Sequence, residues 1–220
     1  MRILKTSFFL ILILYIITLN VFLNAQTCDY GKVRWQQKIS DTEGDFTGIL
    51  YDNDHFGPSA SIGDIDNDGV NDIAVSSSYD DDGGNNRGAI YILFLNIDGT
   101  VKSHQKISDL EGGFAGVLDD NDNFGTCITL IDDLNNDGVN DIAVGAVNDN
   151  DGGVEHGALW ILFLNNDGTV KSHQKISDTE GGFTGVLTDK DWFGNSVELL
   201  GDLNNDGVND IAVGAKGSRN

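Results

Sequence analysis

The sequence feature that most constrains the fold is a nine-residue acidic segment that occurs three times, each copy 69 residues after the previous one. The copies begin at Asp64, Asp133 and Asp202, and each leads directly into Ile-Ala-Val. Self-similarity at a fixed period is typical of repeat architectures, in which one structural unit recurs along the chain. The sequence therefore predicts an array of similar units, each with an acidic loop that feeds a short apolar strand.

Oxygen-bearing residues alternate at positions 1, 3 and 5 of each segment, so their side chains can turn towards a common centre. Position 7 can add a backbone carbonyl, and the Asp at position 9 can close the shell. Calcium prefers six to eight hard oxygen ligands in flexible geometry. The predicted calcium ligands are Asp64, Asp66, Asp68, Val70 and Asp72 in the first copy, Asp133, Asn135, Asp137, Val139 and Asp141 in the second, and Asp202, Asn204, Asp206, Val208 and Asp210 in the third. We expect about three sites with structural Ca2+, because a filled shell leaves no open position for a reacting water.

An EF-hand matches only the first half of this pattern. It needs a bidentate Glu at position 12 and flanking helices, whereas position 12 here is Val75, Val144 or Val213 within an apparent strand. Asp-Asn-Asp-Gly is also ordinary turn chemistry, and magnesium is a further alternative, although it tends to keep several waters. Three copies with Asp or Asn at every side-chain ligand position favour calcium over both alternatives.

The first 25 residues have the composition of a secretory signal peptide. Arg2 and Lys5 precede an almost wholly apolar run from Phe8 to Leu23, and Ala25 offers a small-residue cleavage point. An uncleaved membrane anchor is the alternative, but two polar residues interrupt the run and leave it short for a span. We therefore expect a mature chain of residues 26–220 that is secreted, with display at the cell surface as a variant of the same prediction.

The net charge of −22 argues against partners that are polyanions. A strongly acidic surface repels nucleic acid and anionic membranes, so we expect neither as a partner of the mature chain. The two cysteines, Cys28 and Cys127, are too few and too far apart in sequence for a zinc site. Export permits a disulfide between them, and an inert buried thiol at Cys127 is the alternative.

Each repeat contains four candidate β-strands and no sustained helical periodicity. In the central repeat they cover residues 126–131, 142–146, 158–164 and 170–176, with the acidic loop between the first two. A tight Asn166-Asp167-Gly168 turn joins the last pair, which is a strong hairpin signal. The fourth strand is polar and is expected to form a solvent-facing outer edge guarded by charge. The expected fold class is therefore all-β, with propeller blades of four antiparallel strands.

Three motifs recur in the same order along the repeats. Phe-Gly at Phe56, Phe124 and Phe193 precedes the acidic loop, and Gly-Ala-Ile-Tyr from Gly88 or Gly-Ala-Leu-Trp from Gly157 follows it. Together they resemble the FG-GAP repeats of integrin alpha-chain β-propellers over about residues 32–215, although the proline of the GAP element is lacking. The resemblance implies calcium at the loop positions named above and a role in cell–matrix or cell–cell adhesion.

The repeats are expected at residues 56–123, 124–192 and 193–220, with an initial outer strand at 32–40. The third repeat stops after its second strand, whereas propellers need about four to eight blades to close. We therefore expect an incomplete ring of about three blades. It is either a truncated product whose C-terminal blades are missing or a unit that several copies complete as a homo-oligomer.

These features favour a secreted calcium-binding module for adhesion or protein–protein interaction, with an extracellular protein or glycan as its unidentified partner. The candidate contact loops are residues 79–87 and 148–156, together with the segments that precede Phe-Gly, and solvated spacers are the alternative for the acidic loops. Enzymatic activity is not expected, because catalysis needs an asymmetric constellation, whereas His104 and His173 are equivalent positions on expected solvent-facing strands. The alternatives are a calcium-dependent carbohydrate-binding module, for which Trp192 is the best aromatic candidate, and a non-catalytic fragment of a larger extracellular enzyme.

Overall fold

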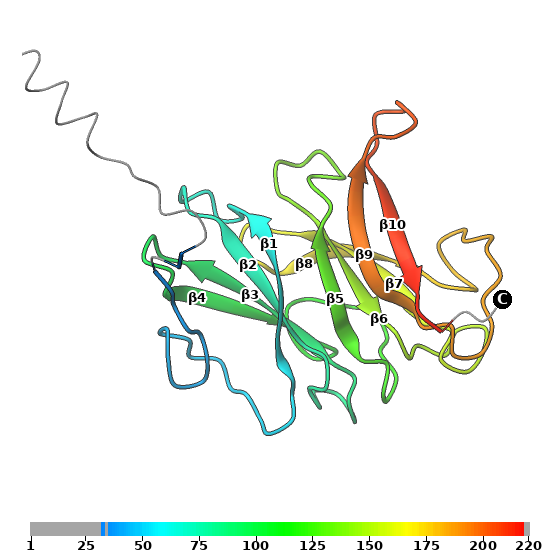
Figure 1. The fold of residues 1–220 in the computed structure, drawn as a ribbon, viewed down its shortest axis with the longest axis horizontal. Coiled ribbons are helices and arrows are strands. Elements are labelled where there is room, and N and C mark those ends of the chain that lie inside the picture. Colours follow the sequence, from blue (N-terminus) through cyan, green and yellow to red (C-terminus); the bar gives the residue numbers. More distant parts are fainter. Residues whose placement is uncertain (1–31, 34, 218–220) are drawn as a thin grey trace, which may run out of the picture. The chain divides into compact units, whose positions relative to one another are not determined.

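The structure, a computed structural model, describes residues 32, 33 and 35–217 (Figure 1). The chain divides into two units, residues 1–36 and residues 37–220. The expected signal peptide at residues 1–25 and Cys28 lie outside the described residues. Within the described ranges, no helix has the length and apolar character needed to cross a bilayer.

The described residues form three antiparallel β-sheets. The first sheet contains β1 (Phe56–Gly63), β2 (Asp72–Ser77), β3 (Ala89–Leu95) and β4 (Val101–Ile107). The second contains β5 (Phe124–Leu130), β6 (Ile142–Ala146), β7 (Ala158–Leu164) and β8 (Val170–Ile176), and the third contains β9 (Phe193–Gly201) and β10 (Asp210–Ala215). All neighbouring pairs are antiparallel and follow chain order. The chain is therefore all-β, as expected, with two four-stranded propeller blades and the first two strands of a third.

Successive sheets meet through their first strands. β5 lies beside both β1 and β9 (Figure 1), which is the arrangement of inner strands around a propeller axis. One continuous apolar core fills the space between the first two sheets. It contains Ile62, Ile65, Ala74, Ile90, Ile92, Phe94, Ile107, Phe114, Leu118, Phe124, Val139, Ile142, Val144, Ala146, Trp160, Leu162, Leu164 and Val170.

The third strands are apolar along almost their whole length because their alternate residues serve two different cores. Ile90, Ile92 and Phe94 of β3 face the core between the first two sheets, whereas Tyr91 and Leu93 belong to a cluster on the opposite face. A strand that is buried on both faces reads as a near-continuous hydrophobic run. Complete burial of one such side chain contributes roughly 1.5–3 kcal/mol.

The Phe-Gly motif joins one blade to the next. The first strand of the second sheet begins at Phe124, two residues before the predicted start, because the Phe124 N–H already donates to the Arg87 carbonyl of the preceding blade at 2.9 Å. Gly125 has a φ of 96°, and an added Cβ would lie 2.9 Å from the Ala89 carbonyl oxygen. Glycine is required here because only a residue without a side chain permits this approach. The predicted bounds of β6, β7 and β8 are confirmed.

The expected strand at residues 32–40 does not form. The described part of that segment is irregular up to residue 39, and Ser40 makes one isolated bridge with Glu43. The equivalent Lys-Ile-Ser-Asp sequences lie at the ends of β4 and β8, where β3 and β7 supply the neighbouring ladder. A strand needs such a partner for its backbone groups, and the described residues hold no third strand left over for this segment.

β4 and β8 form the outer edges of their sheets, as expected, and both carry exposed polar residues near their starts. The expectation is wrong for His104 and His173, which are half-buried beneath a crossing segment. In the first sheet, the Val101 N–H donates to the Gly44 carbonyl at 2.8 Å, and Phe46 packs 5.0 Å from His104, centroid to centroid. The ring of His173 lies 5.2 Å from the equivalent Phe114 ring. Burial lowers the pKa of His104. Both histidines are therefore packing residues beneath aromatic side chains.

Candidate metal centre

The three acidic segments form the loops between the first and second strands of their sheets. Residues 64–72 join β1 to β2, residues 133–141 join β5 to β6, and residues 202–210 join β9 to β10. Each loop therefore occupies the same place in its blade. The antiparallel pairs on either side hold the two ends of each loop in fixed positions.

The first loop is an inward-facing turn built by its own carboxylates. Asp64 accepts hydrogen bonds from the N–H groups of Asp68 at 3.0 Å and Gly69 at 2.8 Å, and Asp66 accepts a second bond from Asp68 N–H at 3.1 Å. Asp68 in turn accepts from Val70 N–H at 2.9 Å. These bonds hold the side chains of positions 1, 3 and 5 towards the interior of the loop.

Three carboxylates converge in this loop. Asp64, Asp66 and Asp72 each offer one oxygen, and these oxygens lie within 4.8 Å of one another. Calcium–oxygen distances of about 2.3–2.6 Å place two ligands on opposite sides of one ion at most about 5 Å apart. The spacing is therefore compatible with one cation bound by all three groups. Asp68 and Val70 join the same turn through the hydrogen bond between them.

The second and third loops repeat this construction. Position 3 is an amide there, and Asn135 and Asn204 each accept an N–H bond from position 5, at 2.9 Å and 2.8 Å. The remaining bonds join the same loop positions as in the first loop. They involve Asp133, Asp137, Gly138 and Val139 in the second loop and Asp202, Asp206, Gly207 and Val208 in the third. The side chains at positions 1, 3, 5 and 9 all end in carboxylate or amide groups, whose oxygens are suitable calcium ligands.

A lysine from the fourth strand reaches into each of the first two loops. Lys102 Nζ lies 2.6 Å from Asp66 and 2.6 Å from Asp68, and Lys171 Nζ lies 2.7 Å from Asp137. The side-chain hydrogen bond from Lys102 lowers the pKa of Asp68, and that from Lys171 lowers the pKa of Asp137. The sequence interpretation missed these lysines, although their equivalent places in the repeat were visible.

The position-9 carboxylates of the first two loops also have a structural role. Asp72 and Asp141 are 1% and 0% exposed. Asp141 accepts hydrogen bonds from Leu134 N–H in the loop at 3.0 Å and from Leu164 N–H at the end of β7 at 3.2 Å. Asp72 makes the equivalent pair of bonds, and burial raises the pKa of both carboxyls. Among the residues that the structure describes, Asp210 of the third loop accepts only the loop bond, from Leu203 N–H at 2.9 Å.

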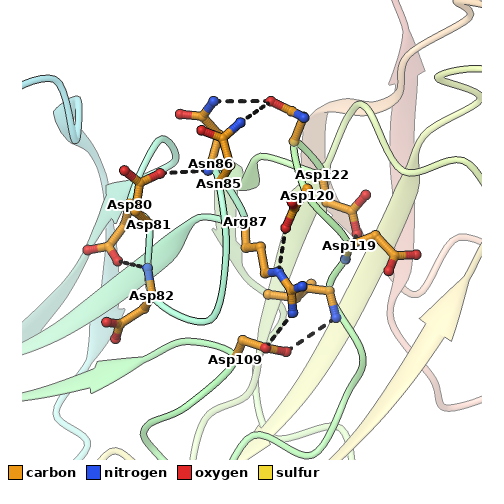
Figure 2. Close-up of polar contacts among 12 residues, drawn as sticks. Asp80, Asp81, Asp82, Asn85, Asn86, Arg87, Asp109, Asp119, Asp120 and Asp122 are labelled. Carbon is orange, nitrogen blue, oxygen red and sulfur yellow. Dashed lines mark hydrogen bonds and ion pairs between the residues drawn. The ribbon is translucent and has the colours of Figure 1, made fainter.

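A second polar network joins the first two blades (Figure 2). Arg87 follows the acidic turn after β2 and contacts Asp109 at 2.7 Å and Asp120 at 3.0 Å. Beside it, the amides of Asn85 and Asn86 both donate to the side-chain oxygen of Asn121, at 3.0 and 3.1 Å. These contacts connect the loop of one blade to the segment that leads into the next blade.

Histidine takes the place of this arginine at the following junction. His156 Nδ1 lies 3.5 Å from Asp178, and its Nε2 lies 3.4 Å from Asp189. A permanently charged guanidinium therefore bridges the first junction, whereas an imidazole occupies the second.

The acidic loops at 79–87 and 148–156 fold back onto buried lysines. Lys106 Nζ lies 2.9 Å from Asp80 and 2.8 Å from Asp82. Lys175 Nζ lies 2.7 Å from both equivalent carboxylates, Asp149 and Asp151. The alternative of free solvated spacers is therefore wrong for these side chains, which are engaged within their own blades.

Cys127 is a free thiol on β5 and donates its S–H to the Gly194 carbonyl at 3.0 Å. Burial raises the pKa of this thiol to about 11. The thiolate is the reactive form of cysteine, and burial disfavours that form at Cys127.

Comparison with known proteins gives a consistent result. The FG-GAP repeat family matches residues 56–93 and 193–220. Integrin alpha-2 of Mus musculus is 32% identical over 167 residues, and integrin alpha-11 of Homo sapiens is 32% identical over 172 residues; each match covers 74% of this chain and 13% of the relative. Integrin alpha-PS5 of Drosophila melanogaster is 31% identical over 172 residues, which cover 75% of this chain and 15% of the relative.

The chain thus spans about 13–15% of the length of these relatives. The family match includes the Phe-Gly motif and the acidic loop of the first and third repeats. The repeats therefore place this chain in the integrin alpha-like FG-GAP family.

Proposed function

We propose that this chain is an extracellular, calcium-stabilised FG-GAP module for adhesion or protein–protein interaction. The observation that carries the proposal is the loop between β1 and β2, in which Asp64, Asp66 and Asp72 bring three carboxylate oxygens within 4.8 Å. Similarity to integrin alpha chains supports the interaction function. No catalytic role is part of this proposal.

Calcium would stabilise the fold rather than react. Positions 1, 3, 5 and 9 would supply side-chain oxygens, and the carbonyls of Val70, Val139 and Val208 would supply the position-7 ligands. The bound ion would neutralise carboxylates that otherwise repel one another in a chain of net charge −22. Because calcium binds the folded loop, it raises stability by mass action. Extracellular modules bind calcium with dissociation constants of about 10⁻⁴–10⁻³ M.

Cell attachment to a surface coated with the mature chain tests the interaction function directly. We expect cells to attach in calcium and to detach in chelator, and we expect a chain with Asp68→Ala, Asp137→Ala and Asp206→Ala to support less attachment. A coat of unrelated acidic protein with matched density is the control. Equal attachment to both coats in calcium would contradict the proposal.

Asp137→Ala is expected to reduce the calcium-dependent rise in melting temperature by about 5–10 °C, the size of one lost saturated site in a chain of this length. The substitution removes the position-5 carboxylate of the second loop. Thermal melts in calcium and in chelator give the effect as the difference between the two conditions. Asp41→Ala removes an exposed carboxylate outside the loops and should leave that difference intact. An unchanged calcium response in Asp137→Ala would mean that this loop binds no metal.

Lys102→Ala is expected to tighten calcium binding at the first loop by about two- to fivefold, because exposed ion pairs are weak but must break when the metal enters. The ammonium contacts Asp66 and Asp68, both predicted calcium ligands. Calorimetric titration with calcium measures the change. Lys38→Ala removes a different exposed pair, with Glu43, and should not alter the affinity. Weaker binding in Lys102→Ala would show that the lysine supports the site.

A further inference from the structure

A pocket of about 250 Å³ lies at the ends of the second strands opposite the acidic loops. The first loop precedes β2, whereas Ser78 and Tyr79 of the pocket follow it. Asn123 and Trp192 enter from the Phe-Gly junctions of the second and third repeats, and Lys216 follows β10. Residues from three successive blades therefore build one pocket away from the calcium loops.

Trp192 holds an unusual backbone conformation at this pocket. Its φ is 54°, in the left-handed region that bulky residues rarely adopt. The equivalent Asn123 has a φ of 56°, and asparagine tolerates that conformation at little cost. The indole N–H of Trp192 donates to Glu155 at 2.9 Å, which fixes the ring. His55, at the same position of the first repeat, has a φ of 58°, so the turn sets this backbone conformation in all three repeats. Trp192 alone places a bulky ring there, and a strained residue that lines a pocket points to a functional role for its side chain.

The pocket combines two aromatic rings with amides held in place by hydrogen bonds and with two further polar side chains. Asn123 and Asn148 are hydrogen-bonded to each other, and Asn123 also donates to the Ser78 carbonyl, which fixes both amides. Among the described residues, the hydroxyl of Tyr79 and the ammonium of Lys216 make no hydrogen bond or ion pair, and both line the pocket. A ligand can therefore find two rings, oriented amides and free donors in the same place.

Charge distinguishes this pocket from two larger cavities in the chain. Those cavities, of about 440 and 280 Å³, include the carboxylates Asp151 and Asp82, each already paired with a buried lysine. No carboxylate lines the 250 Å³ pocket. The overall charge of −22 repels anionic polymers at a distance, so a neutral ligand with many hydroxyl groups fits best.

We propose that this pocket binds one ring of a neutral sugar at the end of a glycan. The apolar C–H face of such a ring would lie against Trp192 or Tyr79, and its hydroxyl groups would bond to the amides of Asn148 and Asn195 and to Lys216. The volume is just below that of pockets for drug-sized ligands, about 300–1,000 Å³, and suits a single ring. The inference deepens the proposed interaction function by naming a ligand class, and it assigns calcium no bridging role.

Saturation-transfer NMR on the mature chain tests the pocket, with methyl glycosides of glucose, galactose, mannose, fucose and N-acetylglucosamine as probes. We expect transfer to at least one glycoside and at least a tenfold loss of affinity in Trp192→Asn. That variant carries the residue of the second repeat at the same left-handed position, so its melting temperature should not fall. Trp35→Asn removes an exposed tryptophan outside the pocket and should bind as the original chain does.

Asp137→Ala separates a sugar pocket from a calcium-bridged lectin. Under conditions where this variant is folded by circular dichroism, sugar binding should remain. Loss of binding in a folded Asp137→Ala chain, unchanged binding in Trp192→Asn, or transfer only to acidic sugars or carboxylate peptides would each overturn the inference. So would the lack of transfer to every neutral glycoside at millimolar concentration. Cell attachment without sugar binding would end this inference but leave the proposed function standing.

Discussion

Asp141→Ala is expected to lower the free energy of unfolding by about 3 kcal/mol or more, in chelator as well as in calcium. The carboxylate is completely buried and accepts hydrogen bonds from Leu134 N–H and Leu164 N–H. Alanine leaves both backbone donors without their partner, and each charge-assisted bond contributes roughly 1.5–3 kcal/mol. Burial raises the pKa of Asp141, so its ionised form is unfavourable in the folded chain. Alanine removes that unfavourable charge, and the loss of unfolding free energy is therefore expected near the lower end of this range.

Asp210→Ala is the matched control for this prediction. Asp210 is the equivalent residue of the third loop, but within the described part of the chain it accepts a single bond, from Leu203 N–H. We expect its loss to cost about 1 kcal/mol in chelator. Urea denaturation of both variants in chelator measures the two effects without a contribution from the metal. If the two substitutions cost the same amount, the bond between the loop and β7 is not what stabilises the blade.

Asp122→Asn is expected to stabilise the chain more at pH 8 than at pH 5, by about 2–3 kcal/mol. Asp122 is 2% exposed and accepts a hydrogen bond from Asp119 N–H at 2.8 Å, while its other carboxylate oxygen has no hydrogen-bond partner among the described residues. Burial raises the pKa of Asp122 to about 7, and the charge of Asp149 acts in the same direction. The folded state therefore favours the protonated carboxyl.

The sign follows from proton linkage. Because the folded pKa is raised above the unfolded value of 3.8, the stability linked to this proton is complete below about pH 4. It is lost as the pH rises from about 4 to about 7. Two pH units at 1.36 kcal/mol each give the effect expected between pH 5 and pH 8. Asparagine does not titrate, so the variant lacks this part of the pH dependence.

The third repeat supplies the control for Asp122. Asp191 is its equivalent, and both of its oxygens accept hydrogen bonds from Thr188, one from the backbone and one from the hydroxyl. Asp119 stands where Thr188 stands and has no such hydroxyl. Asp119→Thr should therefore satisfy the free oxygen of Asp122 and flatten the same pH dependence. Urea denaturation across pH 5–8 tests both variants, and parallel curves for Asp122→Asn and the original chain would contradict the assignment.

The repeat pattern predicted the strands well because propeller blades are built from local antiparallel pairs. Hairpin turns and apolar third strands fix β6, β7 and β8 from short stretches of sequence. The strand predicted at residues 32–40 was wrong for the opposite reason. A fourth strand needs a preceding third strand as its hydrogen-bonding partner, and the residues of the segment alone do not supply one. Likewise, β5 begins earlier than predicted because Phe124 bonds to the Arg87 carbonyl of the preceding blade.

The candidate loops were found from sequence because their ligand positions are close along the chain. Lys102, Lys106 and Lys175 were not, since each meets its carboxylates from a strand 24 or more residues away. The polar appearance of the fourth strands predicted exposure, whereas Lys106 and Lys175 are buried against the acidic turns of their blades. Pairing between distant charges is set by the fold and cannot be read from periodicity alone.

Calorimetric titration of the mature chain with calcium shows whether the repeated acidic loops bind the ion. We expect saturable binding of about three ions per chain, together with a higher melting temperature in calcium than in chelator. Combined substitution of Asp68, Asp137 and Asp206 by alanine should remove most of the binding heat. No binding heat at millimolar calcium, with identical melts in calcium and chelator, would mean that the loops bind no calcium.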